Sequence, residues 1–233
     1  MIAAVNPFEV WTLVFTIIGV LAFVFVPYVR KVAEWFVTII HEVGHGFFSL
    51  ITGGGISGIA LHKDGSGSTN TTHRVGLFTW FTRTIVLFAG YATPLYLGVF
   101  MLFMTVNGHA QAMFYVLIGI GILTLIFIRN FFGILIVFLY FASLGVGMLL
   151  YQGAYIPVFV VFFGILFVFR GILDLLTAGY LVFFVPRNDP LFQRSDFHIL
   201  ADESFFGIPE HVWYIVYIIL NAVAVFFIFN FFG

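Results

Sequence analysis

The sequence contains no cysteine, which excludes disulfide bonds and thiolate metal ligands. Any bound metal must therefore be held by histidine and carboxylate side chains. Charged residues are also scarce, at 8% of the chain against about 25% in an average soluble protein. The net charge of −1 carries no sign of a basic surface, so we expect no nucleic-acid partner. Hydrophobic residues make up 62% and aromatic residues 21% of the chain, which predicts a protein embedded in the lipid bilayer.

Seven apolar segments are long enough to cross a bilayer, which takes about 20 residues of helix. We expect membrane-spanning helices at approximately 9–28, 33–52, 84–106, 110–128, 131–150, 156–185 and 212–231. No remaining polar stretch is large enough for a soluble domain. The sequence therefore predicts one all-α, multi-pass integral membrane domain over residues 1–233.

The second of these segments contains the sequence His41-Glu42-Val43-Gly44-His45. Two histidines four residues apart lie on the same face of a helix. With a glutamate after the first histidine, they form the His-Glu-x-x-His pattern, in which two imidazoles hold Zn²⁺ and the glutamate is the general base. Ionisable groups in a membrane segment indicate a functional site by default. The competing interpretation, a buried polar patch, does not require this order and spacing.

A catalytic zinc ion usually has three protein ligands and one open position, so a third ligand is needed. Asp174 is the only acid inside a later expected span, and it lies at a depth similar to that of His45. We therefore expect Asp174 to be the third ligand, although Arg170, four residues earlier, offers it an ion pair instead. The alternative is Asp196, which reaches the zinc only if the polar segment 186–211 folds back into the membrane. Otherwise Asp196 caps a short helix.

The polar segment 53–83 follows the expected zinc helix. Its three consecutive glycines end the helix. A short strand pattern at 56–61 is followed by a glycine- and serine-rich turn at 63–69. These features predict a small β-hairpin beside the metal site, with a flexible loop as the alternative.

A peptidase substrate must present an extended backbone, because a helix hides its carbonyl groups. We expect the strand at 56–61 to bind such a substrate by edge pairing, with Ile56 and Ile59 among the contacting residues. Asn130, at the tight turn between two expected spans, is a further candidate for substrate binding at the oxyanion, as is His62.

The distribution of basic residues predicts the orientation in the membrane. The expected loops on the side of the N-terminus contain six lysines and arginines, and the loops on the other side contain two. Because cytoplasmic loops carry the excess of positive charge, we expect the N-terminus to be cytoplasmic. The short loops and the lack of a targeting peptide favour a bacterial plasma membrane.

Four segments together resemble the site-2 protease family of intramembrane zinc metalloproteases, and in particular its peptidase M50B-like branch. They are Ile39–Gly46, Gly90–Leu95, Arg129–Gly133 and Ser195–Ala201. The resemblance implies a zinc peptidase that cuts a membrane protein or peptide within or near the bilayer. It carries over the two histidines of the pattern as ligands and its glutamate as the catalytic base. The Asn/Asp-Pro-x-x-Asp-Gly segment that gives better-known members their third ligand is absent, as is a PDZ-like domain.

The leading hypothesis is therefore an intramembrane zinc metallopeptidase in which Glu42 is the general base. The alternative is a non-enzymatic membrane protein, either a metal or ion carrier or a pseudo-protease that binds transmembrane helices. A carrier needs polar residues along a whole path through the membrane, whereas the ionisable residues here gather at one depth. A zinc hydrolase acting on a lipid or another small substrate is a third reading.

Overall fold

The structure is a computed structural model that describes residues 25–73, 79–149, 155–189, 195–203 and 207–232, with a few positions between 14 and 22. This part of the chain is mostly helical and contains one two-stranded antiparallel sheet. In chain order, the elements are α2 (Pro27–Ile51), β1 (Gly55–Leu61), β2 (Gly67–Thr72), α3 (Thr79–Val106), α4 (Ala110–Phe127), α5 (Phe131–Leu149), α6 (Ile156–Phe184), α7 (Asp196–Glu203) and α8 (Glu210–Phe232).

Four helices, α3, α4, α5 and α6, are long and apolar enough to cross a membrane, which supports four of the seven expected spans. Half of the expected span 9–28 lies outside the described residues. A helix forms at 33–52, but α2 is not among the four, because its glutamates and histidines lower its hydropathy. Only the part Glu210–Val223 of α8 is described in enough detail to be judged, and it is a shorter apolar helix.

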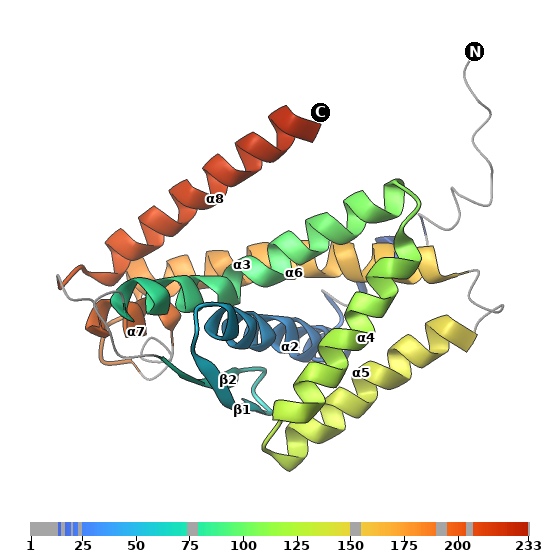
Figure 1. The fold of residues 1–233 in the computed structure, drawn as a ribbon, viewed down its shortest axis with the longest axis horizontal. Helices are drawn as coiled ribbons and strands as arrows, with labels where there is room; N and C mark the ends of the chain where they lie inside the picture. The colour runs from blue at the N-terminus through green and yellow to red at the C-terminus, as the bar shows by residue number, and fades with distance from the viewer. Residues whose placement is uncertain are drawn as a thin grey trace.

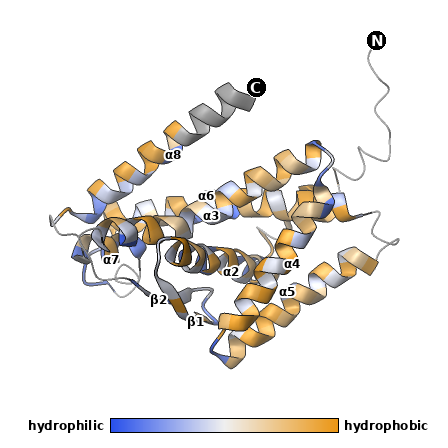
Figure 2. Cartoon of the chain, viewed as in Figure 1, coloured by the Kyte–Doolittle hydropathy of each residue, from blue (hydrophilic) through white to orange (hydrophobic). Residues whose placement is uncertain are grey.

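Helix α2 lies at the centre of the fold, with α3 and α6 packed along it (Figure 1). Small residues allow these helices to approach closely, as is common between membrane helices. A side chain at Gly44 would collide with Thr93 of α3, and one at Gly98 of α3 would collide with the backbone of α6. Apolar residues run along the outer helices α4 and α5 (Figure 2). The close contact at Gly44 presses the His-Glu-x-x-His turn of α2 against α3.

The predicted β-hairpin after α2 is confirmed. Its strands pair antiparallel, with Ile59 opposite Thr69, and β2 has no other strand partner within the described residues. The second edge of β1 is bound by the turn between α4 and α5. There the Arg129 N–H donates to the Ile59 carbonyl at 2.8 Å, and the Asn130 side-chain amide exchanges hydrogen bonds with both backbone groups of Leu61. The hairpin therefore has one closed edge, on β1, and one open edge, on β2.

The hairpin lies beside α2 (Figure 1), and a row of donors on this helix fixes it there. Lys31, Trp35 and Thr38 are spaced four and three residues apart, so they share one helix face. Lys31 and Trp35 donate to backbone carbonyls of the turn 62–65, at 3.2 Å from Trp35. The Thr38 hydroxyl lies 2.8 Å from the Gly65 carbonyl of the turn and 2.8 Å from the Glu34 carbonyl of its own helix. Ser49, further along the same face, donates to the base of the hairpin at 3.1 Å. The His-Glu-x-x-His turn lies between these two anchors.

Candidate metal centre

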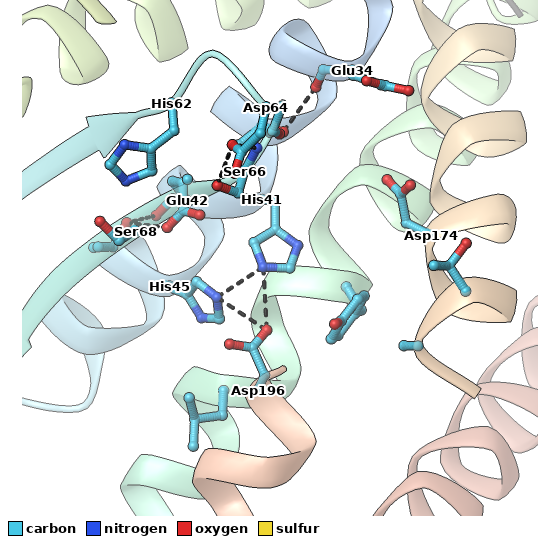
Figure 3. A pocket seen from close by; sticks show the side chains of 18 of the residues that line it. Glu34, His41, Glu42, His45, His62, Asp64, Ser66, Ser68, Asp174 and Asp196 are labelled. Carbon is cyan, nitrogen blue, oxygen red and sulfur yellow. Dashed lines mark hydrogen bonds and ion pairs between the residues drawn. The ribbon is translucent and has the colours of Figure 1, made fainter. Parts of the chain in front are cut away.

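Three side chains converge beside the hairpin. His41 and His45 come from successive turns of α2, and Asp196 is the first residue of α7. The Nε2 atoms of the two histidines are 3.0 Å apart. Asp196 Oδ2 lies 3.2 Å from Nε2 of His41 and 3.4 Å from Nε2 of His45. The three side chains point toward one another in Figure 3. Among the described residues, this is the one group of histidines and acids placed to share a metal ion.

The three atoms have the spacing that a tetrahedral ion requires. Ligand bonds of about 2.0–2.2 Å at the tetrahedral angle separate two ligand atoms by about 3.3 Å. In addition, Asp196 Oδ2 is buried and has no hydrogen-bond donor of good geometry. Lone pairs that face one another at this distance need a cation or a proton between them. Two imidazoles and one carboxylate form a donor set that suits zinc.

A backbone carbonyl orients one of the two imidazoles. His45 Nδ1 donates a hydrogen bond to the Val86 carbonyl of α3 at 2.7 Å. Since Nδ1 carries the proton in this arrangement, the lone pair of Nε2 is free to face the centre. His45 is 6% exposed, so the surrounding helices hold the ring in place.

Glu42 lies next to the centre and is 4% exposed. Its Oε2 is 2.7 Å from the hydroxyl of Thr69 on β2. The strand passes directly over the carboxylate, because a side chain at Gly67 would lie 2.5 Å from Glu42 Oε1. The hairpin therefore covers the glutamate with a hydroxyl group on one side and a bare glycine on the other.

A glycine of α3 makes room for both histidines. A Cβ at Gly90 would lie 2.5 Å from His45 Nε2 and 2.6 Å from His41 Nε2. Pro94, one turn later inside α3, lacks the N–H that would bond to the Gly90 carbonyl. The segment Gly90–Leu95, one of the four that carry the family resemblance, thus places a stretch of helix without a side chain at Gly90 against the metal centre.

Phe197 anchors α7 so that Asp196 faces the histidines. Its ring is 1% exposed and stacks on Tyr91 of α3 at 5.3 Å and 16°. Two tyrosines of α8 complete the socket, with ring centroids 5.3 and 5.7 Å away. Burial alone raises the pKa of Asp196, but His45 and His41, when they are protonated, outweigh burial and hold that pKa well below its usual range. A cation that takes the place of these protons would meet Asp196 in the same carboxylate form.

The structure does not bring Asp174, the preferred third ligand, to the histidines. Its Oδ1 accepts a hydrogen bond from Arg170 at 2.9 Å, which is the ion pair weighed as the alternative. Arg170 also faces Glu34 of α2 at 3.8 Å, and Lys31 pairs with Glu34 at 2.9 Å. These charges link α2 to α6, with Asp174 set apart from the three converging side chains in Figure 3. The geometry favours the alternative candidate from the polar segment, which does fold back to the centre.

One cavity of about 1220 Å³ joins the metal centre to this charged network. Its walls come from α2, α3, α6, α7 and residues 62–71 of the hairpin. Because charged and hydroxyl side chains line it, the cavity can bring water to the buried glutamate. This is the polar access that hydrolysis at a membrane site requires.

The residues expected to bind substrate lie in or against β1, the strand whose outer edge is already bound. Ile56 packs against Gly46 of α2, and Ile59 is 1% exposed in the apolar core. The amide of Asn130 is bound to the backbone of Leu61, as described above. His62 lines the cavity at the turn. The two isoleucines and Asn130 therefore support the hairpin from the side away from the open edge.

A signal for Asp196 was present in the segment Ser195–Ala201. Its later residues Leu200 and Ala201 are 2% and 7% exposed and pack in the same cluster as Phe197. With apolar residues at Phe197, Leu200 and Ala201, the segment has the spacing of a short helix with one buried face. Such a face implies docking against other helices, which would have brought its first residue inward.

Comparison with known families agrees with this arrangement. The family model described as peptidase M50B-like matches residues 14–228, which is nearly the whole chain. No curated protein and no solved structure matches the chain. The segment that supplies α7 and the segment that supplies the paired histidines both lie within the matched range. The chain belongs to the peptidase M50B-like family of membrane-embedded metallopeptidases.

Proposed function

We propose that this chain is an intramembrane zinc metallopeptidase whose ligands are His41, His45 and Asp196 and whose general base is Glu42. The convergence of three ligand atoms, 3.0 to 3.4 Å apart, beside a buried glutamate carries the proposal. The ligands come from segments about 150 residues apart in the chain. Convergence of this kind is hard to explain by the packing of α7 alone, since burying an unpaired carboxylate is costly.

Each residue around the centre has a separate role in the proposed peptide hydrolysis. A bound zinc ion would supply a Lewis acid that polarises the scissile carbonyl and acidifies water. Glu42 takes the proton of the attacking water and delivers it to the leaving amine. The Val86 carbonyl keeps His45 in the tautomer that directs Nε2 inward. The carboxylate of Asp196 contributes negative charge and supplies the third ligand atom.

The substrate backbone is proposed to pair with β2. The edge of β1 is already bound by Arg129 and Asn130, whereas β2 has no second strand partner within the described residues. Residues of β2 line the cavity together with Glu42 and the ligands. An extended segment added to this edge would run past the metal centre and satisfy its own backbone groups on the strand. The edge-binding hypothesis is thus kept but moved from the first strand to the second.

Metal analysis of the purified protein tests the ligand set. We expect one zinc per chain in the wild type and in Asp174→Asn, and its loss in His41→Ala and Asp196→Asn. Asparagine is close in size to aspartate, so the fold should persist while the charged ligand is lost. Loss of zinc in Asp174→Asn with retention in Asp196→Asn would overturn the assignment and restore Asp174 as the ligand.

Cleavage assays test the chemistry. Detergent-purified protein is incubated with fluorescein-labelled casein, an unfolded probe, and with a panel of reconstituted single-span helices. We expect Glu42→Gln to retain zinc and lose cleavage, because the amide cannot take a proton from water. Undiminished cleavage by this variant would refute the mechanism. Zinc flux in proteoliposomes with no cleavage of any probe would favour the carrier hypothesis instead.

A further inference from the structure

The contact between Thr69 and Glu42 links the hairpin to the proposed general base. Thr69 Oγ1 lies 2.7 Å from Glu42 Oε2 and 3.0 Å from the backbone carbonyl of the same residue. A threonine hydroxyl has a single proton to donate. The shorter distance and the negative charge direct that proton to the carboxylate, since hydrogen bonds to ionised acceptors are the stronger ones.

Thr69 is held in position by its place in the sheet. It lies opposite Ile59 of β1, which is 1% exposed in the core. Positions 67, 69 and 71 of β2 are the less exposed ones, so they face inward, as the alternation of a strand predicts. A β-branched side chain in a strand has few rotamers, which limits where its hydroxyl can point.

Rigid anchors hold the hairpin itself. The row of donors on α2 binds the turn at one end and the base at the other, on either side of Glu42. The Arg129 N–H fixes the outer edge of β1. The hydroxyl of Thr69 is therefore carried by a frame that is bound independently of the metal centre.

We propose that Thr69 is a positioning residue for Glu42, an inference that rests on the proposed function. Its hydroxyl binds Oε2 and so fixes the rotation of the carboxylate. Oε1, which lies against Gly67 on the cavity wall, is then the oxygen that takes the proton from water. The bare glycine leaves that oxygen room.

The test compares Thr69→Val, which removes the hydroxyl at nearly constant shape, with Thr69→Ser, which retains it. Thr124→Val is the control, because Thr124 is a fully buried threonine of α4 whose hydroxyl donates to the Ile120 carbonyl of its own helix. Three readouts are taken: zinc content, the kinetics of casein cleavage, and infrared difference spectra. The carboxylate band of Glu42 in these spectra is identified by its absence in Glu42→Gln.

We expect Thr69→Val to retain zinc and to lower kcat about 10-fold, with KM changed less than about twofold, because a hydrogen bond to a charged group is lost. The Glu42 band should shift in Thr69→Val and return in Thr69→Ser, and Thr124→Val should match the wild type. An unshifted band in Thr69→Val, or a kcat equal to that of Thr124→Val, would overturn the proposal. If the wild type cleaves no probe, the proposed function fails, while the band shift still decides whether Thr69 orients the carboxylate.

Discussion

Substituting alanine for Gly90 separates two physical effects that act in opposite directions. Gly90 lies inside α3, where alanine is the better helix former by about 0.5–1 kcal/mol. The new methyl group, however, would lie 2.5 Å from His45 Nε2 and 2.6 Å from His41 Nε2. Helix propensity alone predicts a more stable protein, and the contacts predict a damaged metal centre.

The size of the effect on zinc follows from the distances. Ordinary contacts between non-bonded atoms begin near 3.5 Å, so both rings must retreat by about 1 Å. Metal–ligand distances tolerate deviations of only about 0.2 Å. We therefore expect Gly90→Ala to lower zinc affinity by at least about 100-fold, the upper end of what changes around metal ligands produce. Without zinc, the same crowding of the buried rings should lower the unfolding free energy by about 1–3 kcal/mol, and the gain in helix propensity should offset only part of this loss.

Zinc-dependent thermal unfolding in detergent measures both effects in one experiment. A ligand at 100 times its Kd stabilises the folded state by about 2.7 kcal/mol, so buffered zinc should raise the Tm of the wild type. Gly90→Ala should unfold below the wild-type Tm without zinc and gain nothing when zinc is added. Gly145→Ala in α5 is the control, because a Cβ at that position would meet no atom within 4 Å.

One result would refute this reasoning. If zinc stabilises Gly90→Ala as much as it stabilises the wild type and Gly145→Ala, the histidines do not bind the metal where α3 constrains them. The assignment of the two Nε2 atoms as ligand atoms would then have to be abandoned.

Three further substitutions probe the surroundings of the site by thermal unfolding. Asn130→Leu removes the side-chain partners of the buried Leu61 backbone and should lower the unfolding free energy by about 1–3 kcal/mol. An unchanged Tm would show that the turn does not hold β1. Phe197→Ala leaves a cavity among the aromatic rings and should lower the unfolding free energy by about 3–5 kcal/mol. It should also weaken zinc binding, because the neighbouring Asp196 loses the contact that holds it in place. Normal zinc affinity in a destabilised Phe197→Ala would show that the aromatic contacts of Phe197 do not position Asp196. Arg170→Met leaves Asp174 without its partner and should lower Tm while zinc content stays at one per chain, whereas loss of zinc would tie this pair to the metal.

The histidine pair could be identified from the sequence because its signal is local. His41 and His45 share a helix face through their spacing alone, and the three glycines that follow mark the end of that helix. The hairpin was predictable for the same reason, from a strand pattern and a turn rich in glycine and serine. Each of these features is determined by residues that are close to one another in the sequence.

The third ligand could not be chosen this way, because its position depends on contacts between distant segments. Asp174 was favoured by its depth in an apolar segment, yet the structure pairs it with Arg170. Asp196 reaches the histidines because Phe197 enters a socket built from α3 and α8, which no local pattern describes. Similarly, the open edge of the hairpin is β2 because Asn130, about 70 residues away, closes β1.

The polarity of α2 has a consequence for how the protein is made. This helix carries two histidines and two glutamates, and it is not among the four helices apolar enough to enter a bilayer by themselves. A single charged residue at the centre of a helix disfavours insertion by about 2.5–3.5 kcal/mol. Helix α2 therefore depends on α3, the helix that it packs against most extensively, and on its ion pair with α6 for a stable place in the membrane. Since both follow it in the chain, and Asp196 comes later still, the three candidate ligands can come together only after most of the protein has been synthesised.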